Sequence, residues 1–193
     1  MGRPREFDEQ AALTAAMRVF WEKGYEGASL DDLTAAMGIN RSSLYSTFSD
    51  KEQLFRKVMA QYGEGPMSFM RDALNLPSAR AAIEALLRAT VEFLADPGHP
   101  RGCLSLQGGL ACGTRAESAQ QAMVEWRESA LMALRKRMQQ AKRDGDIPED
   151  VDPKDLARYV LVLVNGLGVQ AASGAKPTEM RRAVELALRM LPV

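Results

Sequence analysis

Residues 28–55 read ASLDDLTAAMGINRSSLYSTFSDKEQLF, and they are the most informative segment of the chain. Ser29 followed by Asp32 is a variant of the capping box and predicts the start of a short helix that Gly38 ends. Asn40 is the expected N-cap of a second short helix. Ser49-Asp50-Lys51-Glu52 is a further capping box and predicts the start of a third helix at that point.

A longer helix is expected before this segment. Leu13, Met17 and Phe20 recur at helical spacing after the N-cap residue Asp8, and Gly24 is expected to end the helix. Together with the two short helices, it forms a three-helix unit with a Gly-Ile-Asn turn before its last helix. Such a helix-turn-helix places its last helix in the major groove of DNA. Periodicity alone leaves open a plain packing unit of three helices.

The last helix of this unit carries groups suited to a DNA surface. No acidic residue occurs between Asp32 and Asp50, and guanidinium and hydroxyl groups bond phosphates or base edges. Lys51 lies in the first turn of the following helix, where backbone amides also favour a phosphate; an ordinary surface lysine is the alternative. The residues expected to face DNA are Ser29, Arg41, Ser42, Ser43, Tyr45, Ser46, Thr47 and Lys51.

The charge balance limits how the protein binds a polyanion. The chain has 25 Lys or Arg and 25 Asp or Glu residues, so its formal net charge is zero and a bulk polyanion binder is excluded. Arg3 and Arg5 precede the first helix and are a candidate arm for the minor groove, with a tail that makes no contact as the alternative. We therefore expect a local basic footprint on double-stranded operator DNA.

These motifs resemble the N-terminal DNA-binding domain of TetR/AcrR-type transcriptional regulators over about the first 60 residues. The glycine-ended first helix, the turn glycine, the Leu44-Tyr45-x-x-Phe48 helix and the Lys51-x-x-Leu54 motif all occur at the family's spacing. The resemblance implies that Tyr45 and Lys51 contact phosphates and that Leu44 and Phe48 belong to the core. It places Arg41, Ser42, Ser43 and Ser46 nearest the groove.

The rest of the chain also repeats apolar residues at helical spacing, so the sequence predicts an all-α protein of about nine helices. Gly63-Glu64-Gly65-Pro66 separates two expected parts. Residues 1–62 form the helix-turn-helix DNA-binding domain, and residues 63–193 form a helical effector-binding and dimerisation domain. Helices of the second part are expected over residues 67–76 and 116–144, and after Ser78, Asp152 and Lys176.

The last two helices are expected to form a homodimer interface. Residues 156–167 leave almost no polar face, so a helix there needs cover on both sides, and the segment is too long for a typical strand. The last helix has Val184, Leu188 and Leu191 on one side and charged residues on the other, which suits a four-helix interface with a symmetry mate. A monomeric core is the alternative.

An effector is expected to bind among the helices of the second part, where core packing is the alternative role for each candidate. Arg101-Gly102-Cys103-Leu104 followed by Gln107-Gly108-Gly109-Leu110-Ala111 is similar to a segment of one TetR/AcrR subgroup, which includes regulators that respond to metals, oxidants or electrophiles. Cys103 and Cys112 on one continuous helix would face opposite sides and could not pair within a chain. The candidate lining residues are Phe69, Phe93, Cys103, Leu106, Met123, Trp126 and Tyr159.

Other classes of protein are disfavoured. The single histidine, His99, lies in a Pro/Gly loop with no triad, P-loop or metal-ligand motif, so we expect neither an enzyme nor a cofactor. A soft-metal site of His99, Cys103 and methionines is a weaker alternative, because methionines at helical spacing usually fill cores. The first residues do not form the apolar h-region of a signal peptide, and no apolar run is long enough to span a membrane. The two cysteines suit a reducing compartment. We therefore expect a cytoplasmic protein without membrane contact.

The function expected from the sequence is that of a ligand-responsive transcriptional repressor. It binds a palindromic operator as a homodimer and is released by a small molecule, an electrophile or oxidant, or a metal. A helical sensor or scaffold that does not bind DNA is the alternative.

Overall fold

The computed structural model describes residues 7–107 and 117–193, and within these ranges it forms ten α-helices and no strand. The helices are α1 (Glu9–Gly27), α2 (Leu30–Met37), α3 (Arg41–Phe48), α4 (Lys51–Glu64), α5 (Phe69–Leu74), α6 (Ala79–Ala95), α7 (Leu104–Gln107), α8 (Glu117–Arg143), α9 (Pro153–Ala172) and α10 (Pro177–Met190). The all-α fold class is confirmed. The expected number of about nine helices is one lower than the ten described, and the four-residue helix α7 is the one that the sequence did not predict.

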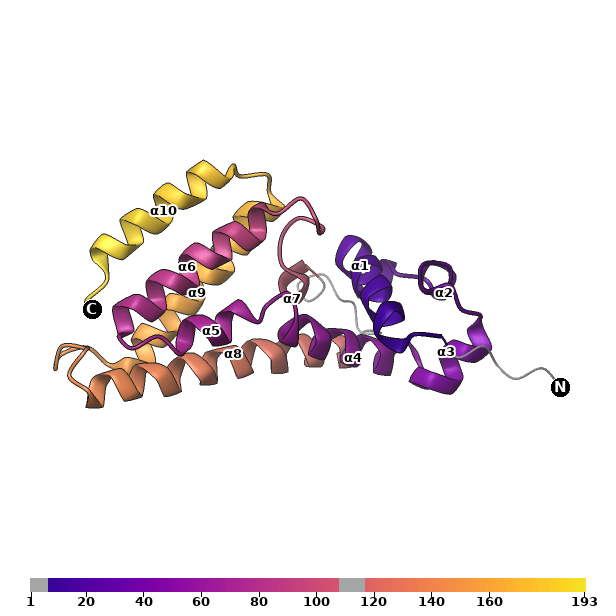
Figure 1. Cartoon of the computed structure of the whole chain (residues 1–193), viewed down its shortest axis with the longest axis horizontal. Coiled ribbons are helices and arrows are strands. Elements are labelled where there is room, and N and C mark those ends of the chain that lie inside the picture. The colour runs from indigo at the N-terminus through magenta and orange to yellow at the C-terminus, as the bar shows by residue number, and fades with distance from the viewer. Residues whose placement is uncertain (1–6, 108–116) are drawn as a thin grey trace.

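The helices form two groups that α4 and α8 connect (Figure 1). The helices α1, α2 and α3 lie at one end of the molecule, while α5, α6, α9 and α10 lie at the other. The long helix α8 runs from the second group to the middle, where it packs against α4. The helix α4 therefore touches both groups, and the predicted boundary after Tyr62 lies within its last turn.

Several helix ends follow the predicted local signals. Ser29 and Asp32 form the capping box of α2: the Asp32 N–H donates to Ser29 Oγ and the Ser29 N–H donates to Asp32 Oδ2, both at 3.0 Å. Gly38 ends α2 in the left-handed conformation, with φ at 66°. Asn40 caps α3 by accepting from the Ser43 N–H at 2.8 Å. The turn between α2 and α3 is thus set by residues within it.

One predicted helix end is confirmed in part and one is wrong. Gly24 interrupts α1 as expected: its backbone angles (φ 69°, ψ 174°) are not helical, so the regular helix kinks there, and a short helical segment continues to Gly27. Ser49 does not cap α4, because it is the C-cap of α3 and has a φ of 68° instead of the extended backbone of an N-cap. Asp50 has the extended backbone that an N-cap needs, and its Oδ1 accepts from the Gln53 N–H at 2.7 Å.

The buried core is continuous between the two groups of helices. Phe20 and Phe55 pack edge to face in the first group, with ring centroids 5.0 Å apart. Trp21 of α1 then contacts Tyr62 of α4 at 5.1 Å, and its Nε1 donates to the Gly102 carbonyl at 3.2 Å. Burial of large apolar side chains is the main favourable contribution to folding. The same burial fixes the position of the helix-turn-helix relative to the remaining helices.

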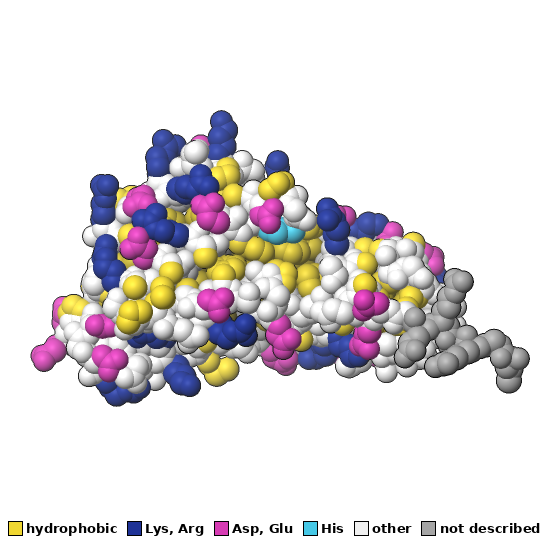
Figure 2. Space-filling view, in the orientation of Figure 1, with side chains coloured by type: hydrophobic (Ala, Val, Ile, Leu, Met, Phe, Trp, Pro, Cys, Tyr) yellow, Lys and Arg dark blue, Asp and Glu magenta, His cyan; other side chains and the backbone are white. Residues whose placement is uncertain are grey.

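The outer surface mixes both signs of charge. Figure 2 shows acidic and basic side chains interspersed over the face in view, with hydrophobic side chains gathered between the two ends of the molecule. None of the helices that the structure describes combines the length and the apolar character that a bilayer crossing needs.

Candidate nucleic-acid interface and effector region

The helix α3 has one buried face and one polar face. Leu44 and Phe48 are almost completely buried against the first group of helices. The other side carries predicted DNA-contacting residues. Arg41, Ser42, Tyr45 and Ser46 are exposed, and Ser43 and Thr47 are half-buried. Tyr45 is 47% exposed, so much of this amphipathic side chain lies at the surface.

Local hydrogen bonds hold the hydroxyl groups of α3. Asn40 Oδ1 accepts from Ser42 Oγ at 2.7 Å as well as from the Ser43 N–H. Ser46 Oγ donates to the Ser43 carbonyl at 3.0 Å. Hydroxyl groups oriented in this way keep a free lone pair and can rotate to bond a phosphate or a base edge.

Arg41 is paired with Asp31 of α2. Its Nη2 and Nε lie 2.8 and 3.2 Å from Asp31 Oδ1, and both side chains are largely exposed. The hydrogen bond from Asp31, followed by its charge, raises the pKa of the Arg41 guanidinium above its usual range. The sequence between Asp32 and Asp50 contains no acidic residue, but in the folded protein Asp31 of α2 lies beside Arg41.

Lys51 lies at the start of α4, and its side chain packs against α1. Its Nζ is 4.4 Å from the centroid of the Tyr25 ring, a cation–π contact. Partial burial lowers the pKa of the Lys51 ammonium, and the charge of Glu26 opposes that shift. At the same helix end, Asp50 accepts the Gln53 N–H, so a phosphate there would meet the ammonium and the remaining amides of the first turn.

Ser29 acts locally as a helix cap. Its Oγ accepts from the Asp32 N–H and donates to Asp32 Oδ2 at 2.7 Å. Lys23 also binds Asp32 at 2.5 Å, and these hydrogen bonds, Lys23 first, lower the pKa of the Asp32 carboxyl to about 2. The predicted arm residues Arg3 and Arg5 lie outside the described residues.

Four of the seven predicted effector residues lie together. Phe93, Cys103, Leu106 and Trp126 line a small cavity of about 20 Å³ between α6, α8 and α9. The Phe69 ring lies 5.5 Å from that of Phe93. The other two candidates lie apart from this cavity: Met123 is fully buried, whereas Tyr159 is 44% exposed on α9.

Cys103 is buried, and its thiol contacts two hydroxyl groups. Its Sγ lies 3.2 Å from Tyr62 Oη and 3.1 Å from Ser105 Oγ, and burial followed by the nearby thiol raises the pKa of Tyr62 well above its usual range. The second predicted thiol, Cys112, lies outside the described residues. The close packing beside Cys103 depends on Gly168, because a Cβ there would come within 2.8 Å of Leu106 Cδ1.

Both ring nitrogens of His99 have backbone partners. Nε2 lies 2.7 Å from the Phe93 carbonyl oxygen and Nδ1 lies 2.9 Å from that of Pro100. The ring also stacks on Trp21, with centroids 4.6 Å apart. In the part of the chain that the structure describes, no group of three or more His, Cys, Asp or Glu residues could hold a metal ion.

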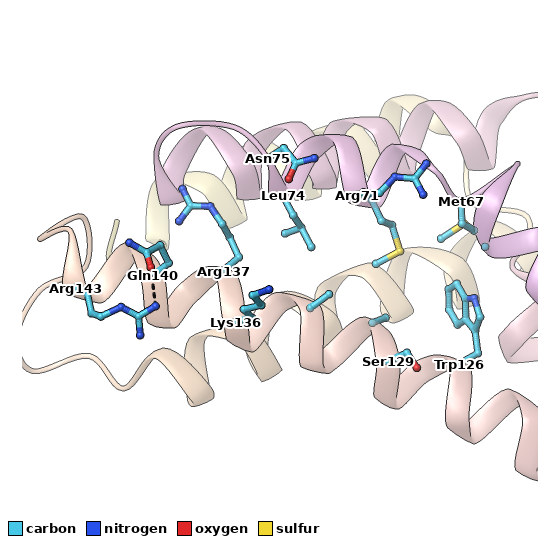
Figure 3. Close-up of a pocket in the computed structure, with 14 residues that line it drawn as sticks. Met67, Arg71, Leu74, Asn75, Trp126, Ser129, Lys136, Arg137, Gln140 and Arg143 are labelled. Atoms are coloured by element: carbon cyan, nitrogen blue, oxygen red, sulfur yellow. Dashed lines mark hydrogen bonds between the residues drawn. The ribbon is translucent and has the colours of Figure 1, made fainter.

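A larger cavity, of about 490 Å³, lies between α5 and α8 (Figure 3). Of the predicted effector residues, only Trp126 lines this α5–α8 cavity, which sequence reasoning otherwise missed. One signal was present: Trp126, Ala130, Ala133 and Arg137 follow the spacing i, i+4, i+7 and i+11, so small residues occupy the middle of one helix face. Their small side chains leave the space that α5 does not fill.

Comparisons with known proteins agree with this architecture. Residues 12–58 match the family described as bacterial regulatory proteins of the tetR family, and residues 79–187 match the tetracyclin repressor-like C-terminal domain. The chain is 28% identical over 193 residues to the HTH-type transcriptional repressor ComR of Escherichia coli (strain K12), covering 99% of this chain and 92% of ComR. It is 33% identical over 162 residues to the uncharacterized HTH-type transcriptional regulator YezE of Bacillus subtilis (strain 168), covering 83% and 84%.

A solved structure is similar over nearly the whole chain. It is a cysteine mutant of the TetR family transcriptional regulator CifR, complexed with 26bp double-strand operator DNA, with 40% identity and a TM-score of 0.93. The match covers 98% of this chain and 100% of the CifR chain. A helix-turn-helix unit joined to a helical domain defines this protein as a DNA-binding transcriptional regulator. The chain belongs to the TetR family, which is a family of regulators rather than of enzymes.

Proposed function

We propose that the protein is a repressor that binds a palindromic operator as a homodimer and leaves it when an effector binds among the C-terminal helices. The observation that supports this most directly is the polar, hydroxyl-rich face of α3, which is exposed while Leu44 and Phe48 anchor the opposite face. The name of ComR as a repressor and the operator complex of CifR support the same function. Because the target is DNA, the proposed site of action is the cytoplasm.

The proposed contacts follow the geometry of α3 and the start of α4. Tyr45 and Lys51 bind phosphates on either side of the major groove, and Arg41 reaches the groove after leaving Asp31. The remaining contacts come from hydroxyl groups and from the N-terminal arm. They are Ser29, Ser42, Ser43, Ser46 and Thr47 with Arg3 and Arg5.

The proposed dimer forms through α9 and α10, which carry exposed apolar side chains among charged ones. Val162 of α9 is 58% exposed, Leu186 and Met190 of α10 are 59% and 71% exposed, and Tyr159 and Val169 of α9 are exposed as well. A groove of about 310 Å³ runs between α9 and α10, lined by apolar residues such as Leu163 and Ala183. Exposed apolar surface of this kind marks protein interfaces, and twofold pairing gives each dimer two recognition helices for successive major grooves.

The proposed coupling runs through α4. This helix begins with Lys51 at the DNA surface and ends near Gly63, where a Cβ atom would lie 3.1 Å from Trp126 Nε1 of α8. Arg56 joins the same two helices by binding Glu125 at 3.3 Å. An effector that shifts α8 thus changes the direction of α4 and the spacing of the two recognition helices. DNA release then depends on the difference in effector affinity between the two conformations. In this scheme residues 1–62 bind DNA, and residues 63–193 bind effector and partner.

A salt titration tests the DNA-binding part of the proposal. Fluorescence anisotropy would follow binding of the protein to labelled DNA from upstream of its own gene, at rising salt concentrations. We expect the logarithm of affinity to fall linearly with that of salt, with a slope reduced by about one in Lys51→Gln. Lys154→Gln, at an exposed position of α9, is the matched control. Binding without a salt slope, unaltered by Lys51→Gln and Tyr45→Phe, would instead support a sensor or scaffold that does not bind DNA.

A further inference from the structure

The α5–α8 cavity carries charge of one sign. Four basic residues line it, namely Arg71 from α5 and Lys136, Arg137 and Arg143 from α8, and none of its 14 lining residues is acidic. The chain as a whole has equal numbers of acidic and basic residues. Clefts lined by one sign of charge concentrate ions of the opposite sign.

In the described part of the chain, these four cations also have no acidic partner, in contrast to two arginines of the same group of helices. On the same group of helices, Arg88 binds Glu84 and Glu185, and Arg181 binds Glu92. Within the described ranges, no salt bridge involves any of the four residues that line the cavity. The polar partner of Arg143 is neutral: its Nη2 donates to Gln140 Oε1 at 2.6 Å, as the dashed line in Figure 3 shows.

Arg137 is held in place but incompletely bonded. Its Nη2 donates to the carbonyls of Leu76 and Pro77, both at 3.1 Å, which fixes the guanidinium at the end of α5. Its Nη1 is buried and has no hydrogen-bond partner in the part of the chain that is described. A buried donor without an acceptor is unfavourable, and an anion at this guanidinium would supply an acceptor once the side chain turns its Nη1 toward the cavity.

The opposite end of the cavity is more apolar, with Arg71 as the nearest charged residue. Figure 3 shows Trp126 and Met67 at one end and Gln140 and Arg143 at the other. Trp126 and Lys136 are ten residues apart on α8, which corresponds to about 15 Å along a helix. The volume of about 490 Å³ is that of an ordinary small-molecule site. The cavity therefore has the shape and polarity of a site for an amphipathic ligand.

We infer that the α5–α8 cavity binds an organic anion with an apolar body. The anionic group, a carboxylate, sulfonate or phosphate, lies at Lys136, Arg137 and Arg143, and the apolar body lies against Trp126 and Met70. The inference rests on the proposed function only in taking this ligand to be the effector. A ligand beside Trp126 also lies beside Gly63 at the end of α4, so its binding is positioned to act on the helix that starts at the DNA surface.

A pair of probes that differ by one sulfonate group tests the site without DNA. 8-Anilinonaphthalene-1-sulfonate is anionic and N-phenyl-1-naphthylamine is its neutral counterpart, and binding of each to the full-length protein is measured by fluorescence. We expect Lys136→Gln/Arg143→Gln to weaken binding of the sulfonate about tenfold and to leave the neutral probe unchanged. The control Arg101→Gln/Lys154→Gln removes the same charge from exposed positions outside the cavity and should change neither.

A blocking variant tests the location. Ala133 lines the middle of the cavity from an exposed position, so Ala133→Trp fills the space without removing a charge. We expect it to abolish binding of both probes. Undiminished sulfonate binding in Ala133→Trp, or in the double glutamine variant, would overturn the inference. Displacement of the sulfonate probe by decanoate or by decyl phosphate shows which anionic head group the site prefers. If neutral decanol displaced the probe as effectively as either anion, the inference would also be overturned.

A second measurement separates the site from its role. Adding the anionic probe or decanoate to the complex with labelled DNA should lower its anisotropy, and Ala133→Trp should prevent the release. If the probes bind as expected and the complex is unaffected, the anion site stands and its role as the effector site is refuted. If the protein binds no DNA at all, the proposed function fails while the probe measurements still decide the anion site.

Discussion

The pairing of Arg41 with Asp31 predicts that substitutions of these two residues change DNA affinity in opposite directions. In the free protein the Arg41 guanidinium binds Asp31 Oδ1 at 2.8 and 3.2 Å, so contact with DNA requires this pair to separate. Asp31 also places a negative charge close to the proposed phosphate contacts. Asp31→Asn should therefore strengthen DNA binding, whereas Arg41→Ala should weaken it.

The expected change is modest because both side chains are mostly in water. They are 58% and 79% exposed, and exposed ion pairs contribute little. We expect Asp31→Asn to raise DNA affinity about two- to fivefold at low salt, and the gain to shrink as salt screens the pair.

Anisotropy titrations with labelled DNA from upstream of the gene measure this effect. Glu149→Gln, in the exposed turn after α8, removes the same charge far from α3 and serves as the control. In the Arg41→Ala background the benefit of Asp31→Asn should be smaller, since no guanidinium remains to be released. An Asp31→Asn protein that binds DNA no better than wild type, or a Glu149→Gln protein that gains as much, would refute the reasoning.

Further predictions concern stability and assembly. Leu44→Ala removes a fully buried side chain of α3 and should lower the free energy of unfolding by about 3 kcal/mol in urea titrations; a loss below 1 kcal/mol would contradict its core role. Gly38→Ala should cost about 1 kcal/mol in the same assay, because the residue has a φ of 66° and only backbone strain opposes the added methyl group. The pKa of Asp32 is about 2, below its ordinary 3.8, so the ionised form stabilises the fold. The stability difference between wild type and Asp32→Asn should be full above about pH 4 and disappear as the pH falls to about 2, and a difference independent of pH would count against the Lys23 pairing. Leu186→Glu, on the exposed apolar face of α10, should convert dimer to monomer in sedimentation equilibrium, while a variant that stays dimeric would exclude that face from the interface.

The helix-turn-helix was predictable because its signals are local. Ser29, Gly38 and Asn40 each act on backbone groups within a few residues, so the sequence alone shows where α2 ends and α3 begins. The start of α4 was misassigned by one residue for a related reason. Ser49 and Asp50 both suit an N-cap, and the choice depends on how the chain turns between two packed helices, which the capping pattern does not encode.

The contacts between distant segments were not predictable in the same way. Periodicity shows that α8 has an apolar face, but it does not show that α5 leaves part of that face uncovered or that Lys136 and Arg143 border the gap. Tyr159 illustrates the same limit. It lies on a helix with apolar residues almost all round, and only the packing of α9 shows that this side chain points outward. The pairing of Arg41 with Asp31 likewise depends on the angle between two helices.

Trp21 gives the helix-turn-helix unit a second attachment besides α4, with a consequence for how the regulator switches. Its Nε1 binds the Gly102 carbonyl and its ring lies flat on His99, so the indole is fastened to the segment before α7. Movement of α1 relative to α7 would therefore cost both this hydrogen bond and the ring contact. An effector that reorients the DNA-reading unit has to offset the loss of these contacts as well as move α4.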